Sequence, residues 1–246
     1  MISFVPGYFG FAGNQMFQYA ATLALAQHKG VECGWPAGKQ PDLYQIFRMG
    51  DATRRIPHPE MLWTEKQYHY DPTFWDIPDG TMLSGYFQSP RYFESIEAKV
   101  RAAFNFGDDK WLAKRTGDVS IHVRRGDYLS FPEHHPPCSL DYYREAMAKF
   151  PGAHFVVFSD DPGWCLLNIK PLGNVEIVTG QSAVQDMFHM SRCAGGHIIA
   201  NSSFSWWGAW LDPAPTGGVI APAKWFGPAK KDWDTKDLLP EGWERI

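Results

Sequence analysis

The sequence has few cysteines, no long apolar run and no excess of positive charge. Its 246 residues include four cysteines, and no two of them form a Cys-x-x-Cys pair. We therefore expect free thiols in a reducing compartment rather than a disulfide framework. No stretch approaches the ~20 apolar residues of a membrane-spanning helix, and the first residues lack the basic start of a secretory signal. These absences favour a cytoplasmic protein, with peripheral association with a membrane left open.

The charge balance argues against a nucleic-acid partner. Lys and Arg number 23 against 27 Asp and Glu, which gives a formal net charge of −4 and a pI of about 6.1. General nucleic-acid binders are normally basic overall, although a local basic pocket remains compatible with this balance. At 44% apolar and 20% charged residues, the composition is globular and suits one large domain or two small ones.

Hydrophobic patterning predicts an α/β fold. Residues 1–5 indicate a buried strand, a glycine-rich loop follows, and residues 14–30 indicate a helix with Asn14 as its N-cap and Gly30 as its stop. Prolines between 36 and 78 favour short helices and loops. We expect a further strand over 81–87 and a helix over 89–104, capped by Ser89.

The second half alternates between strands and helices more regularly. Strands are expected at 119–123, 154–161, 175–179, 197–203 and 218–222, with helices over 139–150, 162–169, 182–193 and 204–211. Such alternation favours parallel sheets with helices on both faces. The polar stretch 105–118 is the expected boundary between a domain of residues 1–115 and one of residues 116–246.

Four unusual stretches fall at the predicted carboxyl ends of strands, where open α/β sheets bind ligands. They are "GFAGN" (10–14), "HVRRGDY" (122–128), "FSDD" (158–161) and "NSSFSWW" (201–207). Arg124 and Arg125 end a strand and therefore point to opposite faces. Arginine binds phosphate oxygens through bidentate, charge-assisted bonds, so one of the two can hold an anion while the other pairs with an acid such as Asp127. A purely structural network of ion pairs is the alternative.

The other stretches allow two interpretations each. Gly13 lets backbone approach a ligand closely, or it belongs to a plain turn. Ser202 and its neighbours can cap a helix and bind phosphate, or they only cap it. Asp160 can accept hydrogen bonds from a nucleoside, or it lies in a solvated loop. His134 and His135 suggest a metal, but a proline-rich loop explains them better.

Together the motifs resemble glycosyltransferase family 11, the α-1,2-fucosyltransferase family. The resemblance rests on "GNQMFQYA" (13–20), "SIHVRRGDY" (120–128), "FSDD" (158–161) and "IIANSSFSWWGAWL" (198–211), in the order of the family and over nearly the whole chain. "GYFQSPRYF" (85–93) and "CSLDYY" (138–143) are also similar. Two features depart from the family: Gly10-Phe11-Ala12-Gly13 replaces the usual double glycine, and the chain is short, which leaves the acceptor open.

The resemblance implies a GT-B-like fold of two Rossmann-like domains, with an acceptor-side domain (1–115) and a GDP-sugar-binding domain (116–246). It implies an inverting reaction in which the 2-hydroxyl of a galactose displaces GDP from GDP-β-L-fucose. Arg124 would hold the β-phosphate, with His122 and Asp160 near the nucleoside and Asp127 as the candidate base. The remaining donor-site residues that it implies are Gly13, Asn14, Gln15, Asn201, Ser202, Ser203 and Ser205.

The resemblance also implies no resident cofactor, since GDP-fucose is a substrate. We expect no metal either, because an arginine can do the work of a metal ion at the leaving diphosphate. Two alternatives remain. One is a transferase of the same scaffold that uses another nucleotide sugar, and the other is a non-catalytic glycan- or nucleotide-binding protein.

Overall fold

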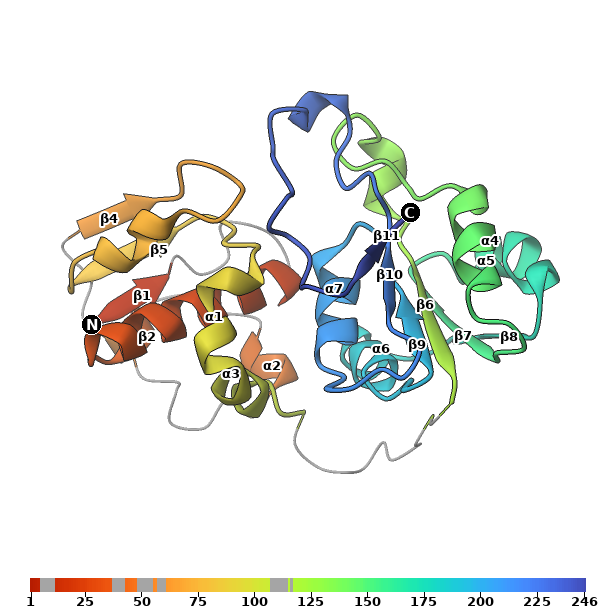
Figure 1. The fold of residues 1–246 in the computed structure, drawn as a ribbon, viewed down its shortest axis with the longest axis horizontal. Helices are drawn as coiled ribbons and strands as arrows, with labels where there is room; N and C mark the ends of the chain where they lie inside the picture. The colour runs from red at the N-terminus through yellow and green to blue at the C-terminus, as the bar shows by residue number, and fades with distance from the viewer. Residues whose placement is uncertain (5–11, 37–42, 48–54, 57–60, 107–114, 116) are drawn as a thin grey trace. The chain divides into compact units, whose positions relative to one another are not determined.

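The structure is a computed structural model that describes residues 1–4, 12–36, 43–47, 55–56, 61–106, 115 and 117–246 (Figure 1). The chain divides into two compact units. The first comprises Met1–Gly107 with Trp233–Pro240, and the second comprises Asp108–Asp232 with Glu241–Ile246. The segment Trp233–Pro240 thus belongs with the first unit, although it lies late in the chain. Most of the stretch 105–118, expected as the boundary, lies outside the described residues.

The first unit carries a five-stranded sheet in the order β3-β2-β1-β5-β4, with parallel pairing throughout. Its strands are β1 (Ile2–Phe4), β2 (Cys33–Pro36), β3 (Arg55–Ile56), β4 (Met61–Thr64) and β5 (Thr81–Ser84). Its α-helices are α1 (Ala12–Lys29), α2 (Leu43–Ile46) and α3 (Glu97–Ala103), and its 3-10 helices are η2 (Pro72–Asp76), η3 (Pro90–Tyr92) and η4 (Glu94–Ile96).

Helix α1 is buried over most of its surface. The four residues predicted as its buried stripe are at most 8% exposed: Met16, Tyr19, Ala20 and Leu23. The helix begins at Ala12, so the prediction of Asn14 as its N-cap is wrong. Asn14 lies in the first turn, and its Oδ1 accepts a hydrogen bond from Nε2 of Gln88 at 2.7 Å. Gly30 follows the helix with a φ of 66°, as expected of a glycine that ends a helix.

The helix expected over 89–104 is broken into η3, η4 and α3. Ser89 does act as a cap, because its Oγ accepts the N–H of Arg91 at 3.3 Å. The break occurs at Phe93, whose φ of −139° is not helical and whose side chain is fully buried. Burial of this ring therefore overrides the local helical preference.

The second unit carries a six-stranded sheet in the order β11-β10-β9-β6-β7-β8, again with parallel pairing. Its strands are β6 (Val119–Val123), β7 (Phe155–Ser159), β8 (Val175–Ile177), β9 (Gly196–Ile198), β10 (Val219–Ala221) and β11 (Glu244–Arg245). Its α-helices are α4 (Leu140–Ala148), α5 (Pro162–Asn168), α6 (Ala183–Met190) and α7 (Ser203–Trp210), and its 3-10 helices are η6 (Asp127–Ser130), η7 (Lys170–Leu172) and η8 (Pro228–Lys230). The sheet therefore has the doubly wound order of a Rossmann fold, and the direction of winding reverses beside β6.

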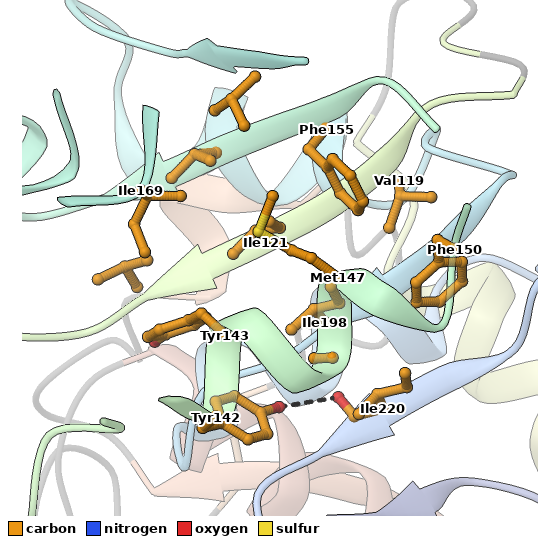
Figure 2. Packing of buried hydrophobic residues seen from close by; sticks show 14 of the residues in the cluster. Val119, Ile121, Tyr142, Tyr143, Met147, Phe150, Phe155, Ile169, Ile198 and Ile220 are labelled. Carbon is orange, nitrogen blue, oxygen red and sulfur yellow. Dashed lines mark hydrogen bonds between the residues drawn. The ribbon is translucent and has the colours of Figure 1, made fainter. Parts of the chain in front are cut away.

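The sheet of the second unit is buried on both faces. On one face, Phe155 and Val157 belong to a core cluster with α4, while on the other Val156 and Phe158 pack with residues of α6. Figure 2 shows α4 lying across the strands, where the Tyr142 hydroxyl donates to the Ile220 carbonyl oxygen at 3.2 Å. The predicted α/β fold with parallel sheets is confirmed.

All four cysteines are free thiols, as expected. Within the described part of the chain, no helix has both the length and the hydrophobicity to cross a membrane.

Candidate functional site

Three neighbouring strands of the second unit end at one edge of its sheet. The strands β9, β6 and β7 lie side by side and run parallel, so the residues after each of them share that edge. Residues 124–128 follow β6, residues 160–161 follow β7, and residues 199–202 connect β9 to α7. Three of the four predicted motifs are therefore brought together, at the position where doubly wound sheets bind ligands.

Arg124 is held between two carboxylates. Its Nη2 donates to Oδ1 of Asp127 at 2.7 Å, and its Nη1 lies 3.0 Å from Oδ2 of Asp160. The guanidinium also lies over the ring of Tyr128, with 5.5 Å between Cζ and the ring centroid. A guanidinium has five N–H donors, so it has further donors to offer a diphosphate while both carboxylates hold it in place.

Arg125 pairs with an acid of the loop after β7. Its Nε donates to Oδ2 of Asp161 at 3.1 Å, and its guanidinium stacks over the ring of Trp164 at 4.1 Å. The sequence predicted that one arginine can hold an anion while the other pairs with an acid such as Asp127. In the structure both arginines have acidic partners, and the one that pairs with Asp127 is Arg124. The N–H of Trp164 and the Arg125 side chain lower the pKa of Asp161.

Asp160 links the loops after β6 and β7. Its Oδ1 accepts the backbone N–H of Arg125 at 2.9 Å, and its Oδ2 contacts Arg124. Gly126 allows this close approach, since a Cβ at that position would lie 2.6 Å from Asp160 Oδ2. Asp160 is exposed, and its carboxylate nevertheless binds the backbone of Arg125 and the side chain of Arg124.

His122 lies in β6 and is only 5% exposed. Burial, with a smaller contribution from the positive charge of Arg124, lowers the pKa of its imidazole to about 3. Its ring packs against Phe204 with 5.3 Å between centroids, and its Nδ1 has no hydrogen-bond partner among the residues that the structure describes. His122 is therefore a neutral imidazole beside Arg124.

Tyr128 joins the β6 loop to the turn before α7, a link that the sequence analysis missed. Its hydroxyl donates to the carbonyl oxygen of Asn201 at 3.0 Å, and burial raises its pKa. Its ring stacks on His135 with 5.0 Å between centroids. Burial and the nearby Lys230 lower the pKa of His135 to about 4, and Lys230 Nζ lies 2.9 Å from its Nε2.

The residues before and in α7 play distinct parts. Ser202 is the N-cap of the helix, and its Oγ accepts the N–H of Phe204 at 3.3 Å. Asn201 braces two loops instead, because its Nδ2 donates to the carbonyl oxygens of Pro136 at 3.0 Å and Trp225 at 2.9 Å. The Ser205 hydroxyl is buried and donates to backbone carbonyls of Ala200 and Ser202. Ser203 is partly exposed in the first turn.

The predicted residues of the first unit lie in the first turn of α1. Gly13 is buried and Gln15 is 1% exposed, while Asn14 is partly exposed and bonded to Gln88 as described above. Gly10, the other glycine of the "GFAGN" stretch, lies outside the described residues.

No three or more His, Cys, Asp or Glu side chains are grouped to hold a metal ion in the described part of the chain. The expectation of metal independence also assumed that the sequence has no Asp-x-Asp triplet, and this is wrong, because Asp232-Trp233-Asp234 is one. Asp234 accepts the N–H of Lys236 at 2.9 Å and forms an ion pair with the side chain of Lys236, and its Oδ2 lies 3.8 Å from Nδ1 of His69.

The profile of glycosyl transferase family 11 matches residues 6–243. An alpha-1,2-colitosyltransferase of Escherichia coli is 39% identical over 96% of this chain and 96% of its own length. Galactoside alpha-(1,2)-fucosyltransferase 1 of Homo sapiens is 32% identical over 81% of this chain, which spans 62% of that protein.

Solved structures of low identity share the fold. The fucosyltransferase NodZ from Bradyrhizobium aligns with a TM-score of 0.54 at 16% identity, over 86% of this chain and 93% of its own. POFUT1 in complex with GDP aligns with a TM-score of 0.54 at 14% identity, over 89% of this chain and 97% of its own. With two parallel sheets flanked by helices and a family match over nearly its whole length, the chain belongs to glycosyl transferase family 11, the α-1,2-fucosyltransferase family, and has a GT-B-like fold.

Proposed function

We propose that the chain transfers L-fucose from GDP-β-L-fucose to the 2-hydroxyl of a galactose in an oligosaccharide or glycoconjugate. The observation that carries this proposal is the Arg124 guanidinium, fixed by Asp127 and Asp160 beyond the carboxyl end of β6. A cation held there suits the diphosphate of a nucleotide sugar. The names of the relatives support the linkage, and the GDP in the POFUT1 complex supports the nucleotide.

In the proposed reaction, O2 of galactose attacks C1 of fucose, and the bond from C1 to the β-phosphate oxygen breaks. GDP leaves with the electron pair, so negative charge develops on its β-phosphate. Arg124 and the N-terminus of α7, with Ser202 and Ser203, would stabilise that charge where it develops. The proton of O2 passes to a base. Asp127 stays our candidate: its Oδ1 contacts Arg124, and Oδ2 can accept the proton.

The other predicted residues receive narrower roles. Asp160 is proposed as a positioning residue, because both of its oxygens hold the arginine pair. Neutral His122 is proposed to bind the donor through Nδ1. Asn201 and Ser205 are proposed to support the α7 turn, because their polar groups bond to the protein itself. Gly13, Asn14 and Gln15 remain proposed donor contacts of the first unit.

A second nucleotide sugar has specific support. The colitosyltransferase matches almost all of this chain and is itself matched over almost all of its length. Colitose is fucose without its 3-hydroxyl, so a site for one sugar differs little from a site for the other. Sites that do not bond a hydroxyl discriminate weakly against its loss. We therefore name GDP-colitose as the alternative donor.

The test is GDP release from GDP-fucose and, separately, from GDP-colitose, with lactose or N-acetyllactosamine as acceptor and EDTA present. Linkage analysis of the product then identifies the bond formed. We expect a sugar linked to O2 of galactose, with the larger kcat/KM identifying the donor. Saturable GDP-fucose binding without any product would instead favour a non-catalytic binding protein.

Arg124→Ala is the matched variant in this assay. Because the arginine contacts the leaving diphosphate, its removal should lower kcat on the order of 10²–10³-fold while circular dichroism stays unchanged. Arg144→Ala is the control, because Arg144 is 54% exposed in its side chain and pairs with Asp141 on the surface of α4. Full transfer activity of the Arg124 variant would overturn the assignment.

A further inference from the structure

Three aromatic side chains gather in the first unit where the segment Trp233–Pro240 packs. Trp233 stacks on Tyr68 with 4.9 Å between ring centroids and 20° between planes, and Tyr86 lies 5.4 Å from Trp233. Tyr68 is 7% exposed, whereas Tyr86 and Trp233 are partly exposed. This aromatic cluster (Tyr68, Tyr86 and Trp233) therefore consists of one buried and two partly exposed residues.

The cluster lies at the carboxyl edge of the first unit's sheet. Tyr86 follows β5 by two residues, and Glu65 directly follows β4, the strand paired with β5. Gln88 joins this region to the start of α1, because its Nε2 donates to Asn14 and its Oε1 accepts from the Tyr68 hydroxyl. Ligands of open α/β sheets bind at this edge.

The partly buried carboxylate of Glu65 fixes the turn that carries Tyr86. Oε2 of Glu65 accepts the N–H of Tyr86 at 2.7 Å, and Oε1 accepts the N–H of Phe87 at 3.1 Å. Gly85 makes room for this contact, since a Cβ there would lie 2.4 Å from Cβ of Glu65. Burial raises the pKa of Glu65 to about 7, although the two N–H groups lower it. Keeping this carboxylate ionised therefore costs free energy.

The same turn contains backbone strain. Phe87 has a φ of 51° and is the one non-glycine residue with positive φ among those that the structure describes. Such strain persists where the surrounding structure holds it, and it concentrates at functional sites. A strained turn that is also held by hydrogen bonds to Glu65 can keep the Tyr86 side chain in one orientation.

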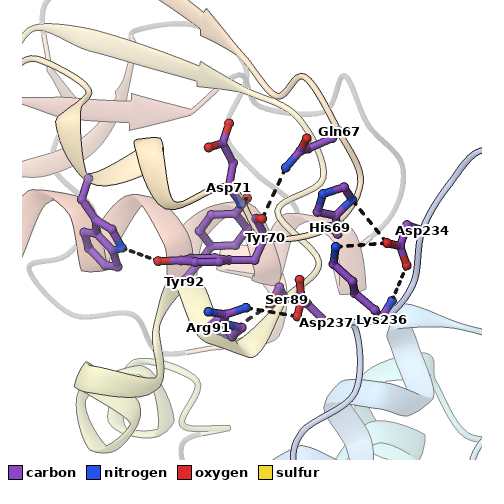
Figure 3. Close-up of polar contacts among 11 residues, drawn as sticks. Gln67, His69, Tyr70, Asp71, Ser89, Arg91, Tyr92, Asp234, Lys236 and Asp237 are labelled. Atoms are coloured by element: carbon purple, nitrogen blue, oxygen red, sulfur yellow. Dashed lines mark hydrogen bonds and ion pairs between the residues drawn. The ribbon is translucent and has the colours of Figure 1, made fainter.

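Polar side-chain contacts of the residues after Trp233 hold the segment that carries it. Arg91 contacts Asp237 at 3.2 Å, and His69 lies 3.8 Å from Asp234 (Figure 3). Leu238 is 2% exposed, so the segment is also anchored by apolar burial. The segment therefore supplies one ring of the cluster and the contacts that keep that ring against Tyr68.

We propose that the aromatic cluster is the acceptor subsite, where a β-galactosyl residue stacks on Trp233 and Tyr86. Galactose has one apolar face, formed by the C–H groups of C3, C4 and C5, and aromatic rings suit such a face. Stacking there leaves O2 at the rim of the sugar ring, open to reaction. The inference rests on the proposed function, because it takes galactose as the acceptor.

The test compares Trp233→Leu, Trp233→Phe and Tyr86→Leu with the wild type in steady-state transfer to N-acetyllactosamine. The leucine variants should raise the acceptor KM on the order of 10-fold or more, as loss of an aromatic anchor does. Trp233→Phe keeps an aromatic ring, so its acceptor KM should lie much closer to that of the wild type. The Kd for GDP, measured by calorimetry, should stay unchanged, and circular dichroism shows whether each variant is folded. Trp75→Leu is the matched control, because Trp75 is also a partly exposed tryptophan of the first unit and packs on His28 instead.

The outcomes separate this inference from the proposed function. An unchanged acceptor KM in both leucine variants would overturn the subsite while leaving the function intact, and a raised Kd for GDP would indicate that the rings bind the nucleotide instead. A wild type without transfer to galactosides would overturn the function. Saturation-transfer NMR with methyl β-galactoside then tests the subsite by itself. The subsite requires that the galactoside binds to the wild type and that this binding is lost in Trp233→Leu.

Discussion

At the scale of single residues, His122 is a base that the fold keeps neutral. Its pKa is about 3 in the folded protein against 6.5 ordinarily, so between these values only the unfolded chain binds the proton. The free energy of unfolding therefore falls as the pH drops from 6.5 toward 3. Above pH 6.5, His122 is neutral in both states and its titration does not lower the free energy of unfolding. Each pH unit in this window costs about 1.4 kcal/mol.

Urea unfolding of the wild type and of His122→Phe, which keeps a ring against Phe204, measures this effect. Lowering the pH from 7 to 5 should destabilise the wild type by about 2 kcal/mol more than the variant. The exposed His134, replaced by Asn, serves as the control and should follow the wild type. Equal losses in the wild type and His122→Phe would mean that His122 titrates normally.

The sequence predicted that the stretches carrying Arg124, Asp127 and Asp160 lie at one edge of the sheet, but not how these residues pair. Alternation along a strand predicts only that Arg124 and Arg125 diverge. Which acid each arginine contacts depends on the register of β6 against β7, in which Val123 lies opposite Ser159. That register places the residues after both strands side by side, and it is a long-range property that local patterns do not contain. The same reason explains why Glu65 and Trp233 were missed.

At the scale of elements, the loops after β6 and β7 meet at a glycine. A Cβ on residue 126 would lie 2.6 Å from Oδ2 of Asp160, so Gly126→Ala must displace that carboxylate from Arg124. Charge-assisted hydrogen bonds are worth about 1.5–3 kcal/mol, so kcat/KM for the donor should fall about 10- to 100-fold. Gly163→Ala is the control, because its Cβ would meet only Asp161, at 3.9 Å. Equal kcat/KM in both variants would show that the placement of Asp160 does not matter.

The elements of the second unit were more predictable than those of the first. Helix α4 has the predicted cap, since Ser139 Oγ accepts the N–H of Tyr142 at 3.1 Å. Both cap and periodicity are local signals. In the first unit, β2, β3 and β4 are two to four residues long and were not predicted. Their parallel pairing with distant strands selects their conformation, and so short a segment carries no readable period.

At the scale of the whole molecule, the chain forms two parallel sheets, one in each unit. After the second sheet is nearly complete, the segment Trp233–Pro240 packs with the first unit. Nucleotide and acceptor are therefore proposed to have separate supports: Arg124 and α7 for the nucleotide, and the aromatic cluster for the acceptor. The sequence motifs pointed only to the proposed nucleotide site, because its residues lie in continuous stretches of the chain. The proposed acceptor site combines residues more than 140 positions apart in the chain.

Hydrogen exchange of the full chain with GDP tests the nucleotide support and its metal independence together. With GDP at 100 times its Kd, the bound state gains about 2.7 kcal/mol, so amides near the ligand should exchange more slowly. We expect protection of residues 124–128 and 201–205, equal in EDTA and in Mg²⁺, because arginine and helix donors replace a metal there. Protection of residues 12–16 decides whether Gly13, Asn14 and Gln15 take part. Protection that requires Mg²⁺ would contradict metal independence, and Asp232→Asn and Asp234→Asn would then identify whether the Asp-x-Asp triplet holds the ion.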